Sequence, residues 1–90
     1  MEELQKQVAP HHLILQDRNL LELTGVSDLS SFDENVVIAT TSMGELTVHG
    51  HNLNVRHLDL ESGLLALEGK VDSFIYSEGV QSNWLSRLLR

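Results

Sequence analysis

The sequence predicts an all-β domain: an antiparallel meander or sandwich of about seven to eight short strands, followed by a short C-terminal amphipathic helix. Two observations predict the strands: apolar and polar residues alternate with a period of two, and turn residues recur at short intervals. A change to helical spacing near the C-terminus predicts the helix. The 90 residues fit one domain, divided into a flexible N-terminal arm (1–10), a β domain (11–78) and a helical tail (79–90).

The first strands follow from this alternation. Residues 12–24 predict a hairpin, because two apolar runs flank the turn residues Asp17-Arg18-Asn19. Residues 26–32 predict a strand that is rich in Ser and Asp. Residues 36–41 predict a central strand, since their β-branched and apolar side chains suit burial on both faces.

In the second half of the chain, glycines are expected to end the strands. Residues 44–50 and 63–69 each place two apolar residues two apart before a closing Gly. Between these runs the apolar residues move from odd to even positions near Arg56-His57. A shift of one residue turns side chains to the other face, so a bulge or sharp bend is predicted there. Residues 71–76 predict the last strand, with apolar groups on both faces.

The segment 82–90 is the strongest candidate for contact with a partner. Its apolar residues fall on one face of a helix that would be marginal in isolation, so we expect it to dock on something. The predicted partner-binding residues are Trp84, Leu85, Arg87, Leu88, Leu89 and Arg90. The alternative is that Trp84 and Leu88 cover an open face of the domain's own sheet.

Charge and cysteine content exclude several classes of function. Thirteen Asp and Glu against six Lys and Arg give a net charge of −7, which argues against nucleic-acid binding. The absence of Cys favours a reducing compartment and excludes thiolate metal sites and cysteine nucleophiles. No apolar run approaches the length of a membrane span, and the acidic start Met1-Glu2-Glu3 predicts no signal peptide.

Few residues suggest chemistry. His49-Gly50-His51, with His57 nearby, is the one cluster that resembles a set of metal ligands, although Gly50 suggests a turn that would splay the rings. We therefore expect no metal and no cofactor, with solvated histidines at a loop. No Ser lies in a Gly-x-Ser-x-Gly motif and no Gly-rich phosphate loop is present, so the sequence predicts no catalytic residues and no enzyme.

The order of several short motifs between residues 12 and 77 resembles the YabP/YqfC family of sporulation proteins. The motifs are LELTGV (21–26), SFDE (31–34), TSMGELTVHG (41–50), NLNV (52–55), LDLESG (58–63) and LALEGKV (65–71), with Tyr76 near the end. The resemblance implies a non-enzymatic protein of endospore-forming bacteria that acts in assembly of the spore envelope, its coat and cortex. It implies no catalytic residues. It also implies a place in the mother-cell cytoplasm at the forespore surface.

Three functions stay open at this point. The first is a morphogenetic protein that forms a homo-oligomer or binds another spore-envelope protein. The second is a peripheral membrane adaptor that docks on anionic lipid through the helix at 84–90. The third is a metal-binding module built on His49, His51 and His57.

Overall fold

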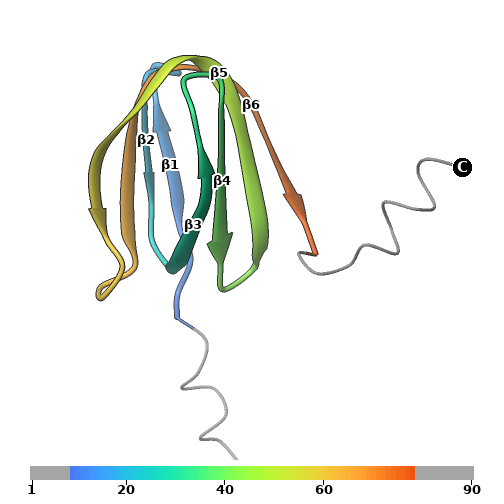
Figure 1. Ribbon diagram of the computed structural model, residues 1–90. Coiled ribbons are helices and arrows are strands. Elements are labelled where there is room, and N and C mark those ends of the chain that lie inside the picture. The colour runs from blue at the N-terminus through green and yellow to red at the C-terminus, as the bar shows by residue number, and fades with distance from the viewer. Residues whose placement is uncertain (1–8, 79–90) are drawn as a thin grey trace, which may run out of the picture.

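The structure is a computed structural model that describes residues 9–78, and these form a single antiparallel sheet of six strands. The strands are β1 (Leu13–Gln16), β2 (Leu20–Leu23), β3 (Val26–Phe32), β4 (Val36–Thr41), β5 (Gly44–Asp59) and β6 (Leu64–Ser77). Their order across the sheet is β1-β2-β6-β5-β4-β3 (Figure 1). The predicted all-β antiparallel class is confirmed. The predicted C-terminal helix and the first eight residues of the predicted arm lie outside the described residues.

The predicted count of seven to eight strands is wrong, because two glycines that were expected to end strands lie inside longer ones. Gly50 is within β5 and Gly69 is within β6. A Cβ on Gly50 would overlap the carbonyl oxygen of Lys70, and one on Gly69 would overlap that of Asn52. These glycines therefore let β5 and β6 bend while they stay paired.

The bend folds the sheet into two layers, as Figure 1 shows where β5 and β6 turn over together. Layer A contains β1, β2, residues 64–68 of β6 and residues 54–59 of β5. Layer B contains β3, β4, residues 44–49 of β5 and residues 73–77 of β6. Each of the two long strands thus belongs to both layers.

The hydrophobic core lies between these layers, and the alternation of the sequence supplies it. The side chains of Leu21, Leu46 and Leu67 are fully buried. The other buried apolar residues are Leu23, Val26, Val37, Ala39, Val48, Leu53, Leu65 and Val71. Leu13 and Leu15 of β1 pack against this cluster, so all six strands contribute to one core.

The predicted bulge is confirmed at Arg56. Val55 pairs with Leu67 and His57 pairs with the next residue, Ala66, so Arg56 has no partner in the ladder. The extra residue reverses the alternation, which is why apolar residues occupy odd positions before it and even positions after it.

Two hairpin turns hold the bend. Three residues, 17–19, join β1 to β2; residues 17 and 18 both have positive φ (51° and 52°), and Asn19 N donates to the carbonyl oxygen of Gln16 (2.9 Å). In the other turn, the N–H groups of Asn35 (2.7 Å) and Val36 (2.9 Å) donate to Asp33 Oδ1 and lower the pKa of that carboxyl.

Backbone hydrogen bonds join both turns to the bend. In the β1–β2 turn, the carbonyl oxygens of Asn19 and Arg18 accept from Gly69 N (3.0 Å) and Val71 N (2.9 Å). In the β3–β4 turn, those of Asn35 and Glu34 accept from Gly50 N (2.9 Å) and Leu53 N (2.9 Å).

None of the described residues forms a helix with the length and apolarity that crossing a membrane requires.

Candidate functional site

The three histidines considered as metal ligands are distributed over both layers. His49 lies opposite Ser73 in layer B, whereas His57 lies opposite Ala66 in layer A. His51 is close to the bend, and its Nδ1 lies 2.9 Å from Asp72 Oδ2. Within residues 9–78, no group of three His, Cys, Asp or Glu side chains is placed to hold a metal ion. The close sequence spacing therefore does not translate into a shared cluster.

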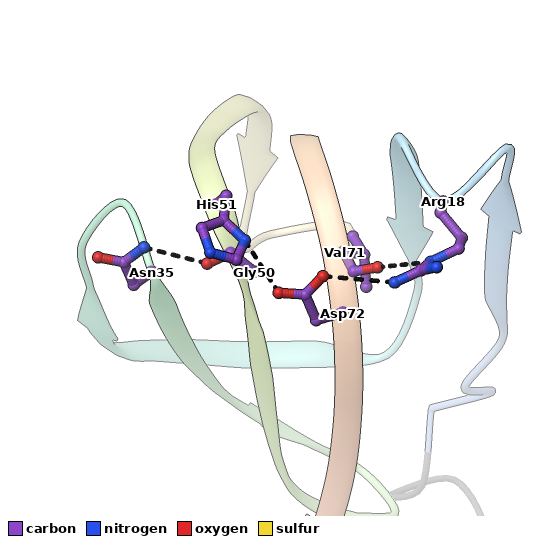
Figure 2. Close-up of polar contacts among 6 residues, drawn as sticks. All are labelled: Arg18, Asn35, Gly50, His51, Val71 and Asp72. Atoms are coloured by element: carbon purple, nitrogen blue, oxygen red, sulfur yellow. Dashed lines mark hydrogen bonds and ion pairs between the residues drawn. The ribbon is translucent and has the colours of Figure 1, made fainter.

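Instead, His51 belongs to a row of polar side chains across the bend (Figure 2). Asp72 Oδ1 accepts from Arg18 Nη2 (3.3 Å) on one side, and Asp72 Oδ2 faces His51 Nδ1 on the other. Arg18 Nε also donates to the carbonyl oxygen of Val71 (3.0 Å). The side chains of Arg18 and His51 are 58% and 67% exposed, so each ion pair contributes less than about 1 kcal/mol. The row fastens the β1–β2 turn to β6.

The end of β6 presents the most distinctive surface of the described residues. β2 pairs only with residues 65–68 of β6, and Arg18 covers the backbone of Val71. Residues 72–77, called here the β6 edge, have β5 on one side and no described strand on the other (Figure 1). Such an edge presents backbone N–H and C=O groups that a further strand can pair with.

Three large side chains along the β6 edge are exposed. Phe74 and Tyr76 lie opposite the buried Val48 and Leu46, so they face the core side but remain 38% and 42% exposed. Ile75 points to the outer face and is 54% exposed. The sequence predicted this strand but not its exposure, because exposure depends on which strands lie beside and above it.

A short hydrogen-bond chain ties the β6 edge to the start of β1. His11 Nδ1 lies 2.7 Å from the carbonyl oxygen of Thr24, which can only accept, so this nitrogen carries a proton. In the neutral ring Nε2 then accepts from the Tyr76 hydroxyl, 2.6 Å away. The two rings meet edge to face, with centroids 5.6 Å apart. Burial raises the pKa of Tyr76.

We expect Tyr76→Phe to remove an alkaline component of stability. The pKa of Tyr76 is higher in the folded state than its ordinary value of 10.0. The Tyr76 contribution to the free energy of unfolding is therefore complete below pH 10.0 and is lost as the pH rises through the folded-state pKa. The variant should also lose about 1 kcal/mol at neutral pH with its hydrogen bond to His11. Urea unfolding at neutral and alkaline pH measures both effects. An equal alkaline loss in the two proteins would contradict this assignment.

Comparison with known proteins places the whole sheet within one family. A family model described as the YabP family matches residues 7–83, a span that contains all six strands. The chain belongs to the YabP family. It is 33% identical to the spore protein YabP of Bacillus subtilis (strain 168) over 73 residues, which are 81% of this chain and 73% of that protein. The predicted resemblance is thus confirmed, and this is a family of sporulation proteins.

The family match and the described structure both stop short of the predicted partner-binding segment. Trp84, Leu85, Arg87, Leu88, Leu89 and Arg90 lie outside the described residues and beyond residue 83, where the YabP match ends. The expectation that they bind a partner stays a prediction.

Proposed function

We propose that this YabP-family protein is a non-enzymatic component in the assembly of the spore envelope. In this role it associates with a second copy or with another envelope protein in the mother cell, at the forespore surface. Membership of the YabP family carries the proposal, since it joins the chain to sporulation. The polar row at the bend supports a structural role, because each of its contacts fastens one backbone segment to another.

The β6 edge supports association as the mode of action. It combines an unpaired strand border with exposed aromatic and aliphatic side chains, which together suit the addition of a strand from another chain. Backbone pairing supplies affinity in this mode, and side chains such as Ile75 supply specificity.

A charged residue on the β6 edge should weaken association without unfolding the domain. Ile75→Glu is suited to this because Ile75 is 54% exposed and points away from the core. Leu60→Glu is the matched control, since Leu60 is 43% exposed in the turn between β5 and β6, away from the β6 edge. We expect light scattering over a range of concentrations to show association in the unchanged protein and the control, and a loss of association in Ile75→Glu.

The same variants test the role in cells. We expect a fluorescent fusion of the unchanged protein and of Leu60→Glu to collect at the forespore, and Ile75→Glu to remain dispersed in the mother cell. Spores from cells that lack the protein should show reduced resistance to lysozyme. A strictly monomeric protein that never reaches the forespore surface would overturn the proposal.

A further inference from the structure

A shallow groove lies on the outer face of layer A, away from the β6 edge. It has a volume of about 570 Å³ and crosses β1, β2, β6 and the end of β5. Its lining combines apolar residues, among them Ile14, Leu20, Leu64 and Ala66, with polar residues such as Glu22 and Arg56. Ile14 is 51% exposed and Leu64 is 38% exposed, so apolar surface remains open to water here in the described part of the chain.

One cross-strand row of lining residues crosses this groove. Ile14, Glu22, Ala66 and His57 lie opposite one another on the four successive strands, so their side chains share the outer face. Four strands spaced about 4.8 Å apart give the row a length of about 14 Å. The occupant that this geometry favours is a short rod with one apolar face.

The chain continues from the end of β6, on the side of the domain where β1 begins. The hydrogen bond between Tyr76 and His11 brings the end of β6 beside the start of β1. The next residue, His12, already lines the groove. Three residues, 79–81, can span up to about 10 Å, and the nine residues 82–90 as a helix would be about 13.5 Å long. The length of this helix matches the length of the row.

Charge also favours this occupant. The segment 79–90 contains two Arg and no acidic residue, whereas all 13 Asp and Glu residues of the chain precede it. Glu22 and Arg56 both line the groove, but Arg56 is paired with Glu68 (3.1 Å), so the Glu22 carboxylate is available to a basic segment there. Another acidic copy of this domain would meet the same face with like charge.

From these observations we propose that residues 82–90 lie across the outer face of layer A as a short helix, with Trp84, Leu85 and Leu88 against the groove floor. The segment then covers its own domain, and the β6 edge stays open. This inference does not rest on the proposed function, because covering the groove and pairing at the β6 edge involve opposite layers of the sheet.

Trp84 provides a direct test, because it is the only tryptophan of the chain. In the full-length protein at low concentration we expect its fluorescence emission to be shifted to the blue and protected from acrylamide. Ile14→Glu, in the groove, should shift the emission to the red and abolish protection. Ile75→Glu, on layer B, should leave both unchanged, with circular dichroism showing that the sheet is intact.

A second pair of variants tests the segment without touching the sheet. Leu88→Glu, on the apolar face of the predicted helix, should release Trp84, whereas Ser86→Glu, on the opposite face, should not. Protection that arises only at high concentration would assign the groove to a second copy and overturn the proposal. Protection of Trp84 that needs anionic vesicles would assign the segment to a membrane and would overturn the proposal. Equal effects of Ile14→Glu and Ile75→Glu on Trp84 would exclude the groove and would also overturn it.

Discussion

Gly69→Ala is expected to destabilise the domain by roughly 3 kcal/mol or more. Gly69 has a φ of 131°, a backbone conformation that residues with a Cβ rarely adopt. An added methyl group would also overlap the backbone of Asn52 and approach the Cα of Leu53 at 2.8 Å. Relief of that overlap requires β5 and β6 to separate where the two layers join. Urea unfolding followed by circular dichroism measures the loss.

Gly63→Ala is the matched control for this substitution. Gly63 also has a positive φ, 79°, but its added Cβ would meet the nearest backbone atoms at 3.2–3.4 Å. We expect a loss of about 1 kcal/mol there, from the unfavourable backbone conformation. If both variants lose the same stability, close packing at the bend is not the reason for glycine at position 69.

Leu67→Ala is expected to cost about 2–5 kcal/mol, because it leaves a cavity between the layers. Leu67 is fully buried and lies opposite the core residue Leu21 in β2 and the half-buried Val55 in β5. A domain of this size has a total free energy of unfolding of only about 5–15 kcal/mol. The variant should therefore be almost completely unfolded at the urea concentration that half unfolds the unchanged protein.

Leu60→Ala removes the same atoms at a different place. Leu60 lies in the turn between β5 and β6 and is 43% exposed, so we expect a loss below about 1 kcal/mol. The difference in urea midpoint between the two leucine variants reports the contribution of burial. Equal midpoints would contradict the assignment of Leu67 to the core.

Local pattern was sufficient to predict most of the strands. The turn between β1 and β2 follows from Asp17-Arg18-Asn19 between two apolar runs, and the bulge at Arg56 follows from the change of alternation around it. Both features arise within a few residues of chain, where steric preference and the side to which each residue points leave few choices.

The glycines show where local pattern was not enough. Gly50 and Gly69 were expected to end strands, since Gly weakens a strand and permits a turn. Their actual role depends on the pairing of β5 with β6. The atom that excludes a Cβ at Gly50 belongs to Lys70, 20 residues later in the chain, and the atom that excludes one at Gly69 belongs to Asn52, 17 residues earlier. The strand count was wrong for this reason.

The candidate surfaces depend on tertiary structure still more. His49, His51 and His57 were grouped by their spacing, yet the bend sends His57 to the other layer and pairs His51 with Asp72. The β6 edge and the groove on layer A are each formed by strands that are distant in the sequence. Their exposure depends on where each strand stops pairing with its neighbour, and this cannot be predicted from the local sequence pattern.

By itself, the sequence determined the all-β class, the positions of the turns, the apolar residues of the core and the membership of the YabP family. Each of these is encoded by side-chain type and short-range order, which are present in the chain before it folds. Only the tertiary structure decided that the sheet bends into two layers, that no other described strand borders residues 72–77 of β6 on the side away from β5, and that the outer face of layer A is grooved. These features come from contacts between distant segments, where backbone approach and burial, not local preference, select the arrangement.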